Sequence, residues 1–243
     1  MVNVIEETRH KWGMVIDTDV CTGCQACVAA CAMENNIPFV GEEDAGYGRS
    51  LHWIRVERFW EGEFPEVQAT PFQPVMCQQC AHAPCEPVCP VFASVHSSSE
   101  MINLQVYNRC VGTRYCANNC PYQVRVFNMR DYDRPDPLPN HLNPSVTVRR
   151  RGIMEKCTFC LQRIVQGENQ AKSEGREIED GEVIPACAQA CPTNAIVFGR
   201  LDDPYSRVSQ MARDGRAVQL LEELGTLPSV TYLKGVSPYG RNP

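Results

Sequence analysis

The sequence predicts an α+β fold made of two interleaved modules with hairpin and loop insertions, each module organised around a pair of cysteine motifs. The first observation behind this expectation is the placement of the 15 cysteines of the 243-residue chain, which fall into four groups with none left over. The second is the pattern between the groups, where alternating apolar and polar residues, as in 51–60, predict short strands rather than long helices.

Three of the four cysteine groups are complete copies of one pattern. They are Cys21-x2-Cys24-x2-Cys27-x3-Cys31, Cys77-x2-Cys80-x4-Cys85-x3-Cys89-Pro90 and Cys157-x2-Cys160-x26-Cys187-x3-Cys191-Pro192. The third group in chain order keeps Cys110, Cys116 and Cys120-Pro121 but has Thr113 at its second position. Three closely spaced cysteines followed by a fourth is the thiolate pattern of bacterial ferredoxins. We therefore expect iron–sulfur clusters.

Two other uses of cysteine fit these groups less well. A disulfide scaffold is typical of small secreted proteins, whereas this chain is long and has an odd number of cysteines. Zinc ribbons also begin with Cys-x2-Cys, but two such pairs hold one tetrahedral ion there. The grouping of three plus one is typical of clusters, because three neighbouring thiolates hold one cluster while the fourth reaches a second cluster.

The spacing between the motifs predicts which of them share clusters. Residues 90–109, 20 in number, separate the second and third motifs, about the separation found in a small bacterial two-cluster ferredoxin. These two motifs therefore form one ferredoxin-like pair, and by elimination the first and fourth form another. The predicted ligand sets are Cys21, Cys24, Cys27 and Cys191 for cluster one; Cys77, Cys80, Cys85 and Cys120 for cluster two; Cys110, Cys116 and Cys89 for cluster three; and Cys157, Cys160, Cys187 and Cys31 for cluster four.

Thr113 faces the fourth iron position of cluster three in this scheme. A neutral hydroxyl is a poor iron ligand beside thiolates, so we expect an empty corner and a 3Fe-4S cluster. The missing thiolate also removes a negative charge, which raises the reduction potential. The alternative is that Thr113 or a water molecule completes a 4Fe-4S cluster. The cofactors expected are therefore three 4Fe-4S clusters and one 3Fe-4S cluster.

The pairing of motifs defines the domain organisation. Module A comprises residues 12–35 and 152–200, with motifs one and four, and module B comprises residues 72–128, with motifs two and three. The whole chain, 1–243, is expected to be a single assembly that ends in a docking tail at 201–243. Four clusters in one such assembly leave little space for a substrate pocket, so the arrangement is suited to conducting electrons.

The first elements surround motif one. Val15-Ile16-Asp17 predicts a short strand that leads into the motif, and the alanine-rich stretch 24–34 predicts a short helix. Residues 35–50 contain Asn, Pro and Gly among acidic residues, which predicts a loop.

Alternation over 51–60 and again over 64–70, with a turn at Glu61-Gly62, predicts a hairpin. We expect its aromatic side chains to form a wall that keeps water from the nearest cluster. Alternation over 101–106 predicts a second strand pair. His96 is expected to be a locally hydrogen-bonded turn residue, and a proton or quinone contact near cluster three is the alternative.

The second half of the chain consists mainly of connectors. Four prolines predict an extended connector at 131–147, and the hydrophilic residues 161–184 predict a loop or short exposed helix, with a docking surface as the alternative. Residues 218–224 predict an amphipathic turn that packs on the core, and residues 230–233 predict a strand.

Charge and hydropathy exclude several classes of function. The formal net charge of −6 argues against nucleic-acid binding, and we expect no nucleic-acid partner. The basic run Arg149-Arg150-Arg151 predicts a solvated turn, with a partner or anionic headgroup contact as the alternative. No run of about 18 apolar residues occurs, so no membrane span is expected. Residues 1–12 lack the apolar stretch of a secretory signal.

The four motifs resemble those of the four-cluster electron-transfer subunits of molybdopterin oxidoreductases, the group that contains dimethyl sulfoxide, polysulfide and nitrate reductases. The resemblance covers about residues 12–200 and includes the long insertion in the fourth motif. The strings 108–116, 147–160 and 220–233 are most similar to the iron–sulfur part of alternative complex III and of the related quinone reductase complex. In members with a non-cysteine residue at the position of Thr113, the family pattern implies a 3Fe-4S cluster.

The resemblance also implies partners. The subunit is expected to lie between a molybdopterin-type chain and an integral-membrane anchor of polysulfide reductase type that binds quinone, with a cytochrome c subunit as a further partner. It departs from the common alternative complex III arrangement, where the ferredoxin part is fused to the molybdopterin-like domain.

The predicted function is therefore a non-catalytic subunit that relays electrons between a membrane quinone site and a redox partner. A free soluble polyferredoxin-type carrier is the alternative, and a catalytic oxidoreductase with an open iron at Thr113 is a third hypothesis. The expected location is peripheral on the membrane. The outer, periplasmic face is favoured because a folded cofactor protein is exportable with a partner that carries a twin-arginine signal, and the cytoplasmic face is the alternative.

Overall fold

The largest sheet joins the two ends of the chain. The computed structural model describes residues 10–69, 71–97 and 100–235. Four strands pair in the order β10-β1-β12-β11. Their bounds are β1 (Trp12–Asp17), β10 (Ile196–Arg200), β11 (Ala217–Val218) and β12 (Val230–Leu233). β1 is antiparallel to β10 and parallel to β12. The segment 201–243, expected to be a docking tail, thus supplies two strands of this sheet.

Aromatic packing ties the sheet to the fourth motif. The rings of Trp12 on β1 and Phe198 on β10 stack with centroids 5.2 Å apart. Phe198 also meets the edge of Phe159, which lies between two cysteines of motif four, at a centroid distance of 5.2 Å. All three side chains are buried. Trp12 on β1 therefore supports motif four indirectly, through Phe198 on β10.

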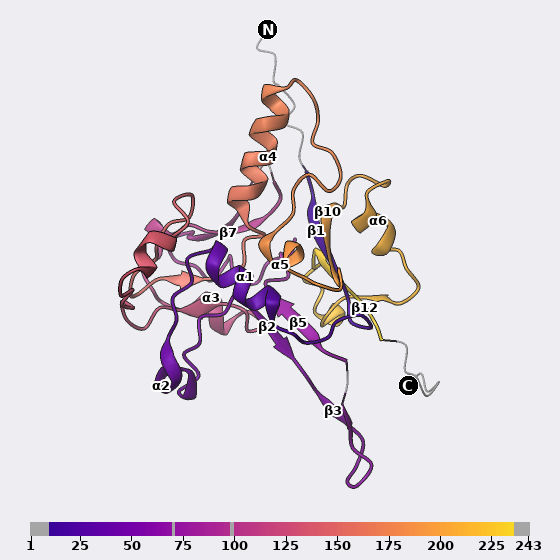
Figure 1. The fold of residues 1–243 in the computed structure, drawn as a ribbon, viewed down its shortest axis with the longest axis horizontal. Coiled ribbons are helices and arrows are strands. Elements are labelled where there is room, and N and C mark those ends of the chain that lie inside the picture. The colour runs from indigo at the N-terminus through magenta and orange to yellow at the C-terminus, as the bar shows by residue number, and fades with distance from the viewer. Residues whose placement is uncertain (1–9, 70, 98–99, 236–243) are drawn as a thin grey trace.

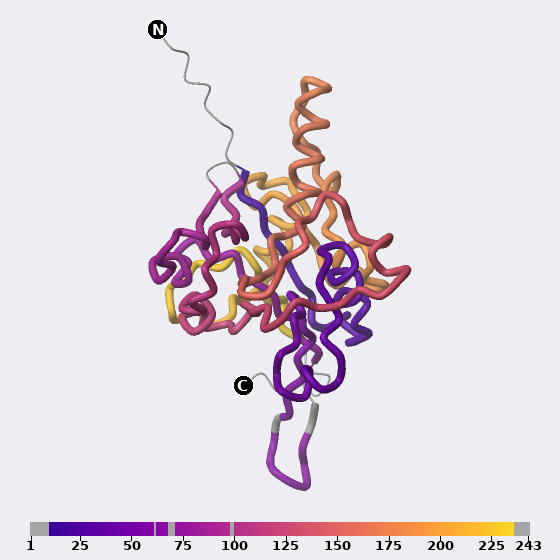
Figure 2. Tube along the Cα trace, turned by 90° about the vertical axis from the view of Figure 1, so that its left-hand side faces the viewer, coloured from indigo at the N-terminus to yellow at the C-terminus, as the bar shows by residue number. Residues whose placement is uncertain are grey.

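The expected hairpin is present but longer than the sequence suggests. β2 (Ile54–Glu57) pairs with β5 (Gln73–Met76), and β3 (Trp60–Glu61) pairs with β4 (Gln68–Ala69) farther out. This arm projects from the body on the side opposite to α4 (Leu161–Ser173), as Figures 1 and 2 show.

The expected aromatic wall is present only at the base of this hairpin, where Trp53 lines the cavity of Cys31 and Cys157, and is wrong for the outer aromatic residues. Trp53, just before β2, is buried, but Trp60 is 65% exposed and Phe64 is 92% exposed. The hairpin extends past the body, so its outer aromatic side chains have no core to cover. Only the base of the arm shields the interior.

Two small antiparallel pairs complete module B. β6 (Ser94–His96) pairs with β7 (Asn103–Gln105), of which the alternation over 101–106 predicts only β7, and β8 (Val126–Phe127) pairs with β9 (Met154–Glu155). His96 lies on β6 rather than in a turn, with its Nδ1 2.6 Å from Glu86 Oε1. β9 leads directly into motif four, so the β8–β9 pair joins module B to module A.

The helices are short. Their bounds are α1 (Ala26–Glu34), α2 (Gly41–Gly46), α3 (Tyr115–Asn118), α4, α5 (Ala186–Gln189) and α6 (Arg207–Met211), with 3-10 turns η1 (Tyr107–Arg109), η2 (Leu138–His141) and η3 (Glu222–Leu224). No helix in the described ranges has the length and apolar character needed to cross a bilayer.

The expected loop at 35–50 contains α2, which is a correction. The buried carboxylate of Asp44 stabilises this turn of helix, because its Oδ1 accepts hydrogen bonds from Arg49 at 3.1 Å and Arg130 at 2.6 Å. These long-range contacts are not visible in the local sequence. The segment 161–184 forms the exposed helix expected there, but it extends over three turns as α4 and stands away from the body (Figure 1).

Tyr232 on β12 provides a test of this topology. Its buried hydroxyl donates to Pro74 O at 2.9 Å and accepts from Gln78 Nε2 at 3.2 Å, linking the sheet to the start of module B. Tyr232→Phe removes both hydrogen bonds from this buried position, so we expect a loss of roughly 1–3 kcal/mol in unfolding free energy. Denaturant unfolding followed by circular dichroism measures it. Tyr205→Phe, at an 85% exposed residue, is the matched control and should change nothing; equal midpoints for both variants would contradict the expectation.

Candidate iron–sulfur sites

Three of the four predicted ligand sets each line one cavity. Cys21, Cys24, Cys27 and Cys191 line the first, Cys77, Cys80, Cys85 and Cys120 the second, and Cys31, Cys157, Cys160 and Cys187 the third. The empty volumes of these cavities are nearly equal, at about 320, 310 and 320 Å³ respectively. All 15 cysteines are free thiols. The cavities therefore correspond to the sets predicted for clusters one, two and four.

The predicted third set also lies together. Cys116 packs with Cys85 and Cys110 in one buried group, and it interacts electrostatically with Cys110 and Cys89. Cys89 and Cys110 are half-buried, whereas Thr113 is exposed. Cys24, the residue of motif one that corresponds to Thr113, is exposed as well. The position without a thiol is thus as exposed as its counterpart in motif one.

Motifs one and three share a backbone conformation. Gly23 and Gly112, each two residues after the first cysteine, have φ of 68° and 74°. A Cβ at Gly112 would lie 2.5 Å from Gly152 O, so only glycine fits this turn. Gln25 and Arg114 are left-handed with φ of 60° and 63°, and the helices α1 and α3 begin directly after them. The two loops therefore curl in the same way around their sites.

The three Cys-Pro turns are equally regular. The third residue after the cysteine is left-handed in each and donates its N–H to the cysteine carbonyl: Phe92 at 3.3 Å, Gln123 at 3.1 Å and Asn194 at 3.2 Å. The next N–H points at sulfur, with Ala93 N 3.2 Å from Cys89 Sγ and Ala195 N 3.3 Å from Cys191 Sγ. Such donors stabilise a thiolate.

Thiol acidity differs between the buried and the outer cysteines. Burial, followed by the charges of neighbouring thiols, raises the pKa of Cys31 well above its usual value. Burial likewise raises the pKa of Cys157 to about 12. At Cys191 burial opposes ionisation too, but hydrogen bonds from Thr193, Ala195 and Ile196 outweigh it and lower the pKa. The buried thiols therefore need a cationic partner such as iron to ionise.

The residues fit iron–sulfur clusters. The walls of the cavities carry soft thiol donors in sets of four, and backbone N–H groups point at their sulfurs, as metal-bound thiolates require. Within ranges 10–69, 71–97 and 100–235, no three His, Cys, Asp or Glu side chains converge on one point as ligands of a single ion. The thiols of sites one, two and four line cavities instead of meeting at one point. Bound clusters would supply one-electron redox chemistry there.

The four sites follow one another through the interior. Thiol–thiol electrostatic interactions link site one to site four through Cys27 and Cys187, and site four to site two through Cys157 and Cys77. Cys116 and Cys85 link site two to site three. All cysteines of sites two and four are buried, whereas sites one and three have exposed or half-buried members. The spatial order is therefore one, four, two, three, with the outer sites at the surface.

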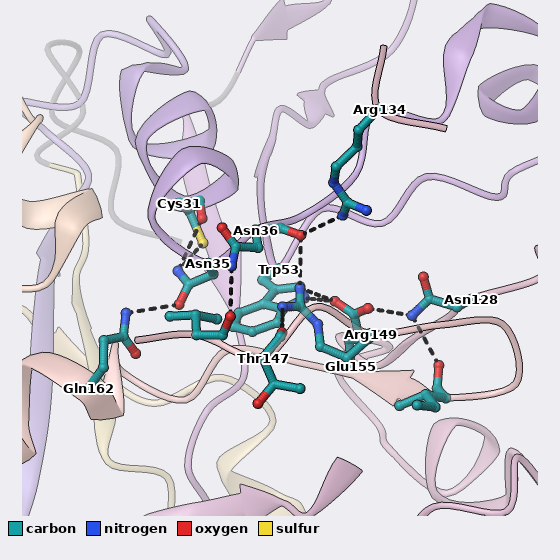
Figure 3. A network of polar contacts seen from close by, with 12 residues as sticks. Cys31, Asn35, Asn36, Trp53, Asn128, Arg134, Thr147, Arg149, Glu155 and Gln162 are labelled. Carbon is teal, nitrogen blue, oxygen red and sulfur yellow. Dashed lines mark hydrogen bonds and ion pairs between the residues drawn. The ribbon is translucent and has the colours of Figure 1, made fainter. Parts of the chain in front are cut away.

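A polar network beside site four was not foreseen from the sequence (Figure 3). The Asn35 amide lies 3.6 Å from Cys31 Sγ and 3.8 Å from Cys160 Sγ. Motif one lacks the trailing proline, so α1 continues past Cys31 and places the side chain four residues later beside the sulfur. That missing proline is the signal that could have identified Asn35. Its amide replaces the backbone donor of the Cys-Pro turns.

The expected solvated turn at Arg149–Arg151 is wrong for its first residue. Arg149 has a fully buried side chain and donates to Glu155 Oε2 at 2.7 Å. Its guanidinium lies 5.1 Å from the Trp53 ring centre, and Trp53 Nε1 donates to the same carboxylate at 3.0 Å. Arg150 and Arg151 are exposed. The carboxylate that neutralises Arg149 lies on β9, so the strand pairing decides its burial.

Removing one partner of this buried pair tests its contribution. Glu155→Gln leaves the Arg149 guanidinium buried without a counter-charge, and we expect a loss of roughly 3–5 kcal/mol in unfolding free energy. Glu177→Gln breaks the long ion pair of a 79% exposed carboxylate with Arg200 (3.7 Å) and is the matched control, without a measurable effect. Anaerobic denaturant unfolding measures both. If the two variants unfold at the same denaturant concentration, the buried pair is not a stabilising contact.

The chain is similar to known 4Fe-4S families. The 4Fe-4S dicluster domain matches residues 109–195, which contain motifs three and four, and a 4Fe-4S binding domain matches residues 12–33, which contain motif one.

Full-length relatives extend this similarity to nearly the whole chain. It is 44% identical to the menaquinone reductase iron–sulfur cluster-binding subunit of Nitratidesulfovibrio vulgaris, over 94% of this chain and 90% of the relative. It is 37% identical to an iron–sulfur protein of Halobacterium salinarum assigned to dimethyl sulfoxide reductase (95% and 82%) and 33% identical to an arsenate respiratory reductase iron–sulfur subunit of Shewanella (92% and 96%). The chain therefore belongs to the family of iron–sulfur electron-transfer subunits of molybdopterin oxidoreductases.

Proposed function

We propose that the chain holds three 4Fe-4S clusters and one 3Fe-4S cluster and relays electrons one at a time between a membrane quinone site and a molybdopterin-type partner. The observation that carries this proposal is the gradient of burial along the four sites. Sites four and two, in the middle, are formed only by buried cysteines, while sites one and three at the ends reach the surface. Such a row admits electrons at one end and releases them at the other.

The ends of the row have different chemistry. Site three has Thr113 at an outer corner, and a 3Fe-4S cluster there has a higher potential than a cluster with four thiolates. We assign the quinone side to this end and the molybdopterin-type partner to site one. The printed name of the menaquinone reductase relative supports a quinone as one of the two redox partners.

The protein's own groups hold the sulfurs and exclude water along the proposed path of the electrons. Left-handed turns hold each sulfur, backbone N–H groups lower the energy of the thiolates, and apolar residues such as Met14, Ile54 and Met76 exclude water from site four. No side chain is needed as an acid, base or nucleophile, so the chain itself is proposed to be non-catalytic.

The proposed assembly is peripheral on the membrane. The subunit would dock on an integral quinone-binding anchor of polysulfide reductase type, with a cytochrome c subunit as a further partner, on the outer face of the membrane. The projecting hairpin supports a bound rather than a freely diffusing subunit, because it presents Trp60 and Phe64 to solvent.

The cluster content is tested by electron paramagnetic resonance on anaerobically purified, air-oxidised protein with iron and zinc counted on the same sample. We expect a 3Fe-4S signal near one spin per chain and about 15 irons, from three clusters of four irons and one of three. About 16 irons and no oxidised signal would contradict the assignment of Thr113. Zinc in place of iron would overturn the proposed function.

Thr113 and Cys24 occupy corresponding positions in motifs three and one. Exchanging Thr and Cys between these positions tests whether cluster three lacks its fourth ligand. Thr113→Cys should complete cluster three, abolish the oxidised 3Fe-4S signal and lower the potential of that cluster. Cys24→Thr, the matched reverse change at the exposed corner of site one, should create a second 3Fe-4S signal and reduce the iron count to about 14. Both are measured by the same spectra. Unchanged spectra in Thr113→Cys would show that residue 113 does not face a cluster corner.

A further inference from the structure

Arg125 is a buried cation at the wall of site two. It follows Cys120 by five residues, is only 6% exposed, and lines the same cavity as Cys77, Cys80 and Cys85. A guanidinium is always charged in proteins, so its burial requires compensation by hydrogen bonds or by negative charge.

The protein groups around Arg125 are neutral. Its Nη atoms donate to Ser94 Oγ at 2.9 and 3.2 Å and to Gln105 Oε1 at 2.5 Å. Ser94 Oγ in turn lies 3.3 Å from Cys85 Sγ and donates to it. The buried Nε of Arg125 has no hydrogen-bond partner among the described residues. These contacts contain no carboxylate, in contrast to the buried Arg149, which pairs with Glu155.

The thiols that interact with Arg125 belong to two different sites and carry negative charge only when they are ionised, as cluster ligands are. Burial acts to lower the pKa of Arg125, but the charges of Cys85 and Cys116, followed by those of Cys77 and Cys120, raise it overall. Cys85, Cys77 and Cys120 belong to site two and Cys116 to site three. Arg125 therefore lies between these two sites and compensates for both.

Module A has no such cation at the corresponding position. The fifth residue after the cysteine of the three Cys-Pro turns is Ser94, Arg125 and Ile196. Ser94 and Arg125 contact each other across module B, whereas Ile196 is a buried apolar residue beside Cys191. The same turn thus carries a charge in one module and a branched hydrocarbon group in the other.

We propose that Arg125 raises the reduction potentials of clusters two and three, because its fixed charge and its unpartnered Nε–H stabilise the extra negative charge of the reduced clusters. The added electron increases the negative charge of a cluster by one, and no bond forms or breaks. Clusters one and four, without a cation at the equivalent position, are not affected. This inference rests on the proposed four-cluster relay and makes Arg125 a determinant of the potentials in module B alone.

The test compares potentials of individual clusters in the full chain with its natural partners bound. Redox-poised samples are followed by low-temperature electron paramagnetic resonance, with iron counted on each preparation. In Arg125→Gln, we expect the potentials of clusters two and three to fall by at least about 59 mV, a tenfold change in a one-electron equilibrium, while those of clusters one and four stay the same. Arg213→Gln, which removes a charge at an exposed residue, is the control and should shift none.

A second variant separates charge from structure. Arg125→Lys keeps the charge but loses Nε and the planar guanidinium fork, so its shift should be smaller than that of Arg125→Gln. Equal shifts in all four clusters, or no shift in Arg125→Gln with full iron content, would overturn the proposal. So would the loss of clusters two and three in both variants, since Arg125 would then serve assembly rather than potential. A wild-type protein without four clusters would refute the proposed function instead, before any variant is compared.

Discussion

The sharing of each cysteine motif between two sites is the constraint on which the rest of the structure depends. The last cysteine of motifs one, three and four lies about one helical turn after the preceding cysteine, but it lines a cavity with the cysteines of another motif. Motifs one and four must therefore come together, although more than a hundred residues separate them. Module B, the hairpin and the connectors lie between them in the sequence. The sheet β10-β1-β12-β11 then pairs a strand that precedes motif one with strands that follow motif four.

Placing so many thiolates in one interior creates an electrostatic problem, which the chain solves locally. Outer sulfurs accept backbone N–H groups at the Cys-Pro turns, and Asn35 serves where the proline is missing. Buried cations stand beside the inner sites: Lys156 is fully buried, and its ammonium group donates to Cys157 O at 2.9 Å. In the low-dielectric interior, the charge of each site is thus balanced by hydrogen-bond donors and cations beside it, and not by groups at the protein surface.

The sequence was most informative where chemistry depends on spacing. The cysteine sets follow from spacing, and the short strand β1, the helix α1 and the strand β7 follow from local patterns. The structure places the thiols of three predicted sets around common cavities. Arg149 was misjudged because it is buried against Trp53 and Asn36, which lie far from it in the sequence. α2 was missed because Asp44 is stabilised by Arg130, 86 residues away. Ion pairs formed by folding have no local periodicity, so burial of a charge is invisible in a sequence window.

The position of β12 late in the sequence also determines when each half of the molecule is able to fold as the chain is synthesised. Every cysteine of module B has been made once residue 120 leaves the ribosome, whereas Cys27 and Cys31 wait for Cys187 and Cys191. β1 waits longer still, because its parallel partner begins at Val230. Non-local pairing of this kind is slow. A nascent chain therefore completes the cysteine sets of sites two and three first, and its N-terminal thiols stay unprotected from oxidation until the chain is almost finished.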